Sequence, residues 1–335
     1  MKRPAGSFNM KKMKRSSREE VKDDCVEDAK ESEEVKDEVL PDLKDDTTAL
    51  TSEKYWFKPE EDEHFQRLLS FCVEWSGTPY LHLVDTFSAS ETMAQIWRAN
   101  GFCAETFDIN RGRKTHDLTS EEGTFCLADL YMSLVSGGLE MASPPCSLHV
   151  FMSSSVHKRS DTNTDGDTTN YKVRLANRIR INYVCVVRVV SMAKKMRNMI
   201  FWHITEQPST SWQFKERDFV KLREEQQLGP PVFTHMGAFG HDLAKPSHLL
   251  GNMPTLGHLK RGKPKHMKTL EDKDEFYYES NGWICGGAKL AGAAAYTEKF
   301  AAAVHMAWLR AYNSPDMQAH HRLHRAGWFS GSSTD

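Results

Sequence analysis

Short apolar runs alternate along the chain with segments in which apolar residues recur at helical spacing, beginning near Tyr55. Apolar runs of strand length lie at 80–85, 103–107, 139–142 and 199–205. Segments with helical spacing lie at about 60–75, 90–100, 120–135 and 171–197. Such alternation predicts an α/β fold with a doubly wound, mostly parallel sheet. Within it, we expect Gly137 and Gly138 to end the helix at 120–135, and Thr119 or Ser120 to cap its start.

The pattern weakens after residue 210. We expect a helix at about 214–227, a strand at 232–236 and an amphipathic helix at 297–312. Segment 237–263 is rich in Gly, Pro, His and Lys, and it predicts no regular element. The expected organisation is therefore one domain over 51–312 with a small irregular C-terminal portion, followed by a loose tail at 313–335.

Charge is strongly segregated, although the net charge of the 335 residues is only −2. Residues 2–15 carry basic but no acidic side chains, and residues 19–46 are mostly Glu, Asp and Lys. A segment with so few apolar residues cannot offset the entropy lost on ordering, so we expect 1–50 to be a disordered charged tail. The basic cluster at 11–15 is either a nuclear import signal or a solvated basic tail.

The seven cysteines are widely spaced, and no two form a Cys-x-x-Cys pair. The sequence also lacks an N-terminal apolar run and any stretch near the ~20 apolar residues that span a membrane. We therefore expect reduced thiols in a nuclear or else cytoplasmic protein that is not secreted and has no membrane span. The same spacing makes a structural metal site unexpected.

Residues that could take part in catalysis or ligand binding follow the ends of the four predicted strands. Asp85, Asp108 and Glu206 each end or follow an apolar run, and Cys146 follows the turn Ser143-Pro144-Pro145. In doubly wound sheets, ligands bind outside the carboxyl ends of the strands. A single acid at a strand end is often only a helix cap, but the coincidence of four such residues predicts a site at this edge of the sheet.

Taken in order over about 80–210, these residues resemble the cytosine carbon-5 DNA methyltransferase family. Residues 84–90 are similar to the family's Asp-Leu-Phe-x-Gly-x-Gly motif, Pro145-Cys146 to its nucleophile motif, and Glu206 to the Glu of Glu-Asn-Val. The resemblance implies a Rossmann-like fold that binds S-adenosylmethionine, with Asp108 on the ribose and Asp117 near the adenine. The cofactor-binding residues that it implies are Asp85, Phe87, Ser88, Ser90, Asp108, Asp117 and Pro144.

The resemblance also implies a covalent mechanism on DNA. The thiolate of Cys146 would add to carbon 6 of cytosine, while Glu206 hydrogen-bonds ring nitrogen 3 and the amino group. Because a base inside a duplex cannot reach such a site, it would be flipped out. The polar loop 147–169 is then a candidate lid, and 212–285 a candidate target-recognition insert. The basic helix face at 172–188 either follows DNA phosphates or is only a solvated face.

The sequence departs from the family pattern at three places. Ser88-Ala89-Ser90 stands in place of the glycines, and Gln207-Pro208 in place of Asn-Val. No Gln-x-Arg-x-Arg motif follows Glu206. Two alternatives therefore stay open, namely a catalytically inactive methyltransferase-like fold that binds nucleic acid or protein, and a methyltransferase that acts on RNA or on a small molecule.

Overall fold

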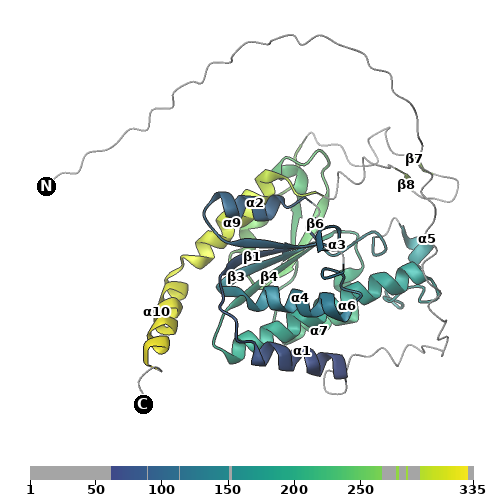
Figure 1. The fold of residues 1–335 in the computed structure, drawn as a ribbon. Helices are drawn as coiled ribbons and strands as arrows, with labels where there is room; N and C mark the ends of the chain where they lie inside the picture. The colour runs from purple at the N-terminus through teal and green to yellow at the C-terminus, as the bar shows by residue number, and fades with distance from the viewer. Residues whose placement is uncertain are drawn as a thin grey trace, which may run out of the picture. The chain divides into compact units, whose positions relative to one another are not determined.

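A computed structural model describes residues 62–88, 90–112, 114–150, 153–265, 277–278, 284–285 and 295–330 (Figure 1). The predicted charged tail at 1–50 and its basic cluster at 11–15 lie outside the described residues. In the described part, no helix is both long and apolar enough to cross a membrane.

The centre of the fold is a mixed sheet of six strands in the order β2-β1-β3-β4-β6-β5. Its strands are β1 (Leu81–Thr86), β2 (Ala104–Phe107), β3 (Leu134–Ala142), β4 (Phe201–Pro208), β5 (Val232–His235) and β6 (Pro246–Gly251). The pairs β1–β2, β1–β3 and β3–β4 are parallel, whereas β6 runs antiparallel to both β4 and β5. The predicted α/β class with a mostly parallel sheet is therefore confirmed, with an antiparallel edge as an addition.

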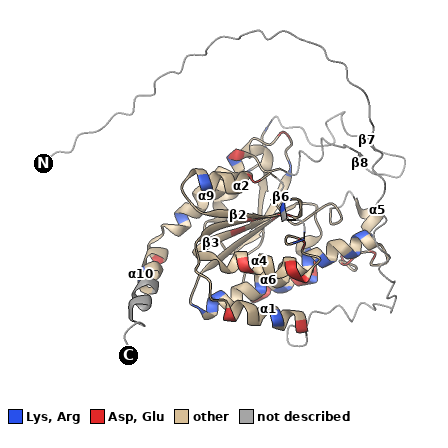
Figure 2. Cartoon of the chain, in the orientation of Figure 1, with Lys and Arg blue, Asp and Glu red and all other residues tan. Residues whose placement is uncertain are grey.

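Helices cover both faces of this sheet (Figure 1). One face packs against α1 (Glu63–Glu74), α4 (Glu121–Met132), α6 (Tyr171–Met196) and α7 (Arg217–Glu225). The other packs against α2 (Thr92–Ala99) and α9 (Glu298–Tyr312). Coverage on both faces explains why the strands read as continuous apolar runs rather than as alternating ones. The charged residues of α6 are all basic (Figure 2).

Shorter elements connect these parts. They are α3 (Ile109–Gly112), α5 (Ser154–His157), η2 (Gln213–Lys215), η3 (Met236–Phe239), η4 (Leu256–Leu259), and the two-stranded pair β7 (Tyr277–Tyr278) and β8 (Ile284–Cys285). The predicted cap at the start of α4 is present, because the Ser120 hydroxyl accepts a hydrogen bond from the backbone N of Gly123 at 3.0 Å.

The order of the strands reverses at β1. The chain passes from β1 to β2 on one side and then to β3 on the other, so the switch point lies between β1 and β3. Thr86 pairs with Ala142, and Ala142 pairs with Thr205, which places the carboxyl ends of β1, β3 and β4 level with one another. A hydrogen bond of 3.2 Å from the Ser143 N to the Thr86 carbonyl closes this edge.

The prediction that Gly137 and Gly138 separate a helix from a strand is wrong. α4 ends at Met132, and β3 begins at Leu134 and runs through both glycines. Gly137 has a φ of +78°, and a Cβ there would lie 2.6 Å from the Met317 side chain. Glycine is favoured at this point of the strand because a positive φ is strained for residues with a side chain.

The C-terminal portion is more regular than the sequence predicts. Residues beyond 313 form α10 (Pro315–Ser330) instead of a loose tail, with Met317 buried and the His320 ring 2.8 Å from the Ser136 hydroxyl. β6 lies within 237–263, where no element is expected, and it is stabilised by its pairing with β4. The candidate recognition insert at 212–285 contains β5 and β6, and both strands belong to the main sheet.

Candidate functional site

The turn after β3 brings Cys146 to the carboxyl edge of the sheet beside Glu206 of β4. The Ser143 hydroxyl donates to Glu206 Oε2 at 3.1 Å, which ties the start of this turn to the neighbouring strand. The Glu206 side chain is only 3% exposed, yet its Oε1 has no hydrogen-bond partner among the residues that the structure describes. An unpaired buried acceptor costs about 1–3 kcal/mol, and Glu206 Oε1 can therefore accept a hydrogen bond from a donor that reaches this edge of the sheet.

The thiol of Cys146 is partly buried and holds its proton at neutral pH. Burial, followed by the charge of the nearby Glu206 carboxylate, raises its pKa to about 11, although the ammonium group of Lys245 opposes the rise. Because only the thiolate is a strong nucleophile, Cys146 requires a change in its surroundings before it can react.

Tyr296, which precedes α9, completes this group. Its hydroxyl hydrogen-bonds with the Ser143 hydroxyl and lies 3.5 Å from Glu206 Oε2. Burial, followed by the charge of Glu206, raises the Tyr296 pKa well above its ordinary value, so the phenol stays neutral. The sequence analysis did not find Tyr296, because a single aromatic residue before a helix carries no distinctive pattern.

Gln207, which replaces the asparagine of the family motif, supports the Pro-Pro turn. Its side chain is 1% exposed, and its Nε2 donates to the Pro144 carbonyl at 2.7 Å. The Ser211 hydroxyl donates to Gln207 Oε1 at 2.9 Å, so both ends of the amide are paired. Pro144, predicted to contact the cofactor, is therefore held in place by β4.

At the end of β1, Asp85 and Ser88 stabilise the turn into α2. The Ser88 hydroxyl donates to Asp85 Oδ2 at 2.5 Å and accepts from the backbone N of Glu91 at 3.1 Å. Burial raises the pKa of Asp85 to about 7, while the hydrogen bonds from Ser88 and the Ala94 backbone oppose the rise. The Asp85 carboxyl is thus buried in the protein. The Ser88 hydroxyl stabilises this turn by hydrogen bonds that glycine, which has no side chain, could not form.

Two non-glycine residues near this turn have a left-handed backbone, namely Phe87 with a φ of +61° and Glu91 with a φ of +53°. Such conformations cost about 1–3 kcal/mol and cluster at functional sites. The Ser90 hydroxyl lies 2.8 Å from that of Thr92, so it also contributes to the start of α2. The Glu91 carboxylate forms an ion pair with Arg111 and accepts from the Thr106 hydroxyl at 3.3 Å.

Asp108 and Asp117 lie beyond the end of β2. Asp108 is 8% exposed, and its Oδ1 accepts from the backbone N of Asn110 at 2.9 Å. Asp117 is partly buried, and its Oδ1 accepts from both the backbone N and the hydroxyl of Thr119, at 2.8 and 2.7 Å. The contacts of Asp117 therefore form a local turn before α4, whereas Asp108 lies beside the end of β1, where a ligand at the switch point would pass.

A buried carboxyl that the sequence analysis missed lies beneath these strand ends. Glu140 of β3 is fully buried and accepts hydrogen bonds from the hydroxyls of Tyr131 at 3.0 Å and Tyr183 at 3.1 Å. The same hydroxyls lie 2.8 Å from those of Thr86 and Thr205, respectively. Burial raises the pKa of Glu140 to about 8, so a largely protonated carboxyl links β1, β3 and β4.

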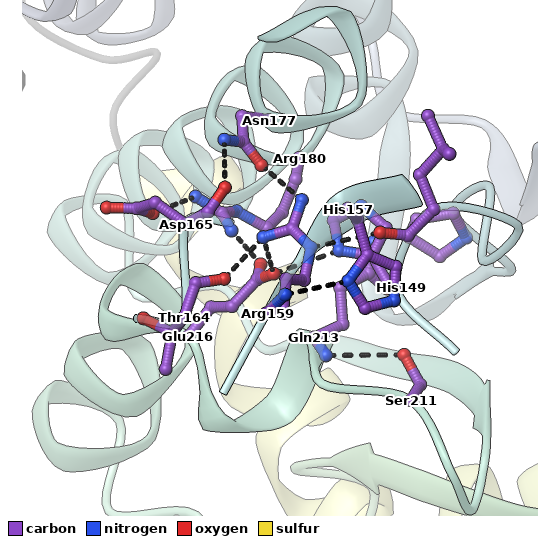
Figure 3. A network of polar contacts seen from close by, with 12 residues as sticks. His149, His157, Arg159, Thr164, Asp165, Asn177, Arg180, Ser211, Gln213 and Glu216 are labelled. Atoms are coloured by element: carbon purple, nitrogen blue, oxygen red, sulfur yellow. Dashed lines mark hydrogen bonds and ion pairs between the residues drawn. The ribbon is translucent and has the colours of Figure 1, made fainter. Parts of the chain in front are cut away.

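The polar segment after Cys146 is anchored by a buried ion network (Figure 3). Glu216 accepts from His149 Nδ1 at 2.9 Å and from Arg159 Nη1 at 2.6 Å, and its second oxygen accepts from Arg180. The backbone N of His149 donates to the Cys146 carbonyl at 2.8 Å. Burial and the two arginines lower the His149 pKa well below its ordinary value, so His149 is neutral. This part of the predicted lid is therefore fixed to α6 and to the start of α7.

Two arginines of the expected basic face of α6 are used inside the protein, whereas Lys172, Arg174 and Arg178 are exposed. Arg180 pairs with Glu216 and Asp218, and Arg188 with Glu225, and both arginines are buried. Composition alone could not reveal these pairs, because the acidic partners lie about forty residues further along the chain. The prediction that Arg180 and Arg188 follow DNA phosphates is therefore wrong.

Comparison with known proteins adds no assignment, since no known protein family and no curated protein matches the chain. The fold and the site alone define an α/β protein with a thiol and a buried carboxylate side by side at the carboxyl edge of its sheet. Residues 62–88, 90–112, 114–150, 153–265 and 295–330 contain no cluster of His, Cys, Asp or Glu that could hold a metal ion.

Proposed function

We propose that this protein is a Rossmann-like methyltransferase that transfers a methyl group from S-adenosylmethionine to carbon 5 of cytosine in DNA. The observation that carries the proposal is the pairing of Cys146 with Glu206, whose buried Oε1 lacks a partner among the described residues. The pair lies next to the switch point between β1 and β3, where ligands bind in doubly wound sheets.

The residues around the switch point fit such a cofactor in part. Asp108 follows the strand next to β1, as an acid that accepts hydrogen bonds from ribose hydroxyls would. Phe87 follows β1 directly and has a left-handed backbone, and its partly buried ring packs edge-on against the buried Tyr183, with the ring centres 5.9 Å apart. Asp117 is assigned to the adenine by resemblance alone. When bound, S-adenosylmethionine would supply an electrophilic methyl group.

In this proposal, Cys146 and Glu206 activate a base that is otherwise a poor nucleophile. The sulfur of Cys146 forms a bond to carbon 6, and the electrons of the ring's 5,6 double bond become available at carbon 5. The proton that Cys146 loses balances the proton that ring nitrogen 3 gains, and Glu206 holds that proton by a hydrogen bond. After methyl transfer, carbon 5 loses its proton to solvent, the double bond re-forms as the thiolate leaves, and the proton of ring nitrogen 3 returns to the thiolate.

The cellular setting follows from the same proposal. We place its action in the nucleus because the basic cluster at 11–15 has the composition of an import signal. Fusion of residues 1–50 to a fluorescent protein tests this point, because a diffuse signal would contradict it.

The experiment that tests the function measures cofactor binding and methyl transfer with the same purified chain. We expect calorimetry to show micromolar binding of S-adenosylmethionine, and labelled methyl groups to reach duplex DNA. RNA and free cytidine serve as competing substrates, and Cys146→Ala serves as the inactive control. A Cys146→Ala protein that methylates DNA as well as the wild type would refute the mechanism.

A second candidate is a methyltransferase-like fold that binds DNA without catalysis. It is favoured by the hydroxyl groups of Ser88 and Ser90, which bond within the turn where glycines would leave the backbone open to the cofactor. This candidate predicts no cofactor binding at millimolar concentration, together with DNA retention that falls steeply with salt.

A further inference from the structure

Lys245 reaches the candidate site from a part of the chain far from both motifs. Because β6 runs antiparallel to β4, its first residues lie at the sheet edge where β3 and β4 end. Ser247 pairs with Pro208, and the backbone N of Ser209 donates to the Pro246 carbonyl at 2.9 Å. Lys245, immediately before this strand, therefore lies at the same edge as Cys146 and Glu206.

The backbone of Lys245 is held in an unfavourable conformation. Its φ is +33°, a value that residues other than glycine rarely adopt and that costs about 1–3 kcal/mol. Its carbonyl accepts a hydrogen bond from the backbone N of Met236 at 3.1 Å, which fixes the start of β6. Strain of this kind persists where the surrounding structure determines the position of the side chain.

The side chain of Lys245 is directed at the group around Glu206. Its Nζ lies 6.0 Å from the centre of the Tyr296 ring, within the range of a cation–π contact. The hydroxyl of the same ring lies 3.5 Å from Glu206 Oε2. Lys245 forms no ion pair with an acidic side chain of the described ranges, so its charge is not already balanced by a partner of its own.

Two charged groups influence the thiol of Cys146, and they act in opposite directions. The Glu206 carboxylate disfavours the thiolate, whereas the Lys245 ammonium favours it. A negative thiolate beside a negative carboxylate in a partly buried site requires a compensating positive charge. The described residues provide that charge through Lys245.

We propose that Lys245 is a positioning residue of this site, whose ammonium group is the counter-charge for the Glu206 carboxylate and the Cys146 thiolate. The inference rests on the proposed function and deepens it, since it names the group that makes a thiolate attainable beside Glu206. Lys245 acts through these two side chains and not by contact with the reacting carbon.

Alkylation of Cys146 by iodoacetamide tests the inference without cofactor or DNA. Below the thiol pKa the rate is proportional to the thiolate fraction, so the ratio of the rates of two variants at one pH reports the difference between their thiol pKa values. The Cys146 peptide is quantified by mass spectrometry across pH 7–10. In Lys245→Met we expect the pKa of Cys146 to rise and the rate at pH 8 to fall by about tenfold, which corresponds to one pKa unit. Lys245→Arg keeps the charge and should retain the wild-type profile within about threefold.

Lys195→Met is the matched control, since Lys195 is exposed on the last turn of α6, at the opposite edge of the sheet. Circular dichroism checks that each variant is folded, and Lys245→Gln gives a second neutral side chain if Lys245→Met does not fold. A pH profile in Lys245→Met and Lys245→Gln that equals that of the wild type would overturn the inference. A shifted profile in a protein that transfers no methyl group would uphold the role of Lys245 and refute the methyltransferase.

Discussion

Glu216 offers the sharpest test of how the segment after Cys146 is held. Its side chain is 0% exposed and accepts hydrogen bonds from His149, Arg159 and Arg180 (Figure 3). Glu216→Ala would leave the charge of Arg159 buried without its ion-pair partner, while Arg180 would keep its pair with Asp218. Breaking a buried ion pair in this way typically destabilises a protein by about 3–5 kcal/mol.

We expect a correspondingly large loss in unfolding experiments. For a domain of this size, 1 kcal/mol lowers the midpoint of thermal unfolding by about 2–4 °C, so Glu216→Ala should lower it by about 6–20 °C. Urea titration followed by circular dichroism gives the free energy of unfolding directly. Glu216→Gln keeps the acceptor oxygen but not the charge, and it should lie between Glu216→Ala and the wild type.

Glu225→Gln is the matched control for Glu216. Glu225 also pairs with an arginine, Arg188, at 2.6 Å, but its side chain is 38% exposed. Ion pairs in contact with solvent contribute about 0–1 kcal/mol, so we expect a loss of that size. Equal losses in Glu216→Ala and Glu225→Gln would refute the conclusion that the buried network anchors this segment.

Two further predictions concern the strand ends. The pKa of Glu140 is raised from 4.5 to about 8, so the native state keeps a proton that the unfolded chain releases. This contribution is fully present below pH 4.5 and is lost as the pH rises through 8, by up to about 5 kcal/mol from 1.36 kcal/mol per pKa unit. Urea titrations at pH 5 and pH 9 should therefore show that Glu140→Gln is more stable relative to the wild type at pH 9, and a pH-independent difference would contradict this cause. Gln207→Leu removes the donor to the Pro144 carbonyl, and we expect a loss of about 1–3 kcal/mol in stability and a changed rate of Cys146 alkylation. Wild-type stability in Gln207→Leu would show that the turn does not depend on this amide.

The parallel half of the sheet could be predicted from the sequence because its signals are local. Buried parallel strands are continuous apolar runs, and the residues that follow them come next in the sequence. This is why Cys146 and Glu206, sixty residues apart, were expected at one edge of the sheet. The register of β3 and β4 brings them there through paired residues such as Ala142 and Thr205.

The remaining parts of the site depend on contacts between distant segments, which a local pattern does not contain. Tyr296, just before α9, lies 3.5 Å from Glu206 Oε2, and Lys245, just before β6, lies over the Tyr296 ring. The same limit explains the errors. The residues next to Arg180 in the sequence do not indicate that it pairs with Glu216, which lies on another element. The residues next to Gly137 do not indicate that this glycine continues a strand beneath the Met317 side chain.

Trapping Cys146 on DNA tests the central claim most directly. A duplex that carries 5-fluorocytosine cannot lose its carbon-5 substituent after methyl transfer, so the bond between the sulfur and carbon 6 persists. With S-adenosylmethionine present, we predict a stable protein–DNA adduct whose attachment maps to Cys146, and none with Cys146→Ala. If the chain binds both S-adenosylmethionine and this DNA but forms no adduct, Cys146 is not the nucleophile and the proposed mechanism is wrong.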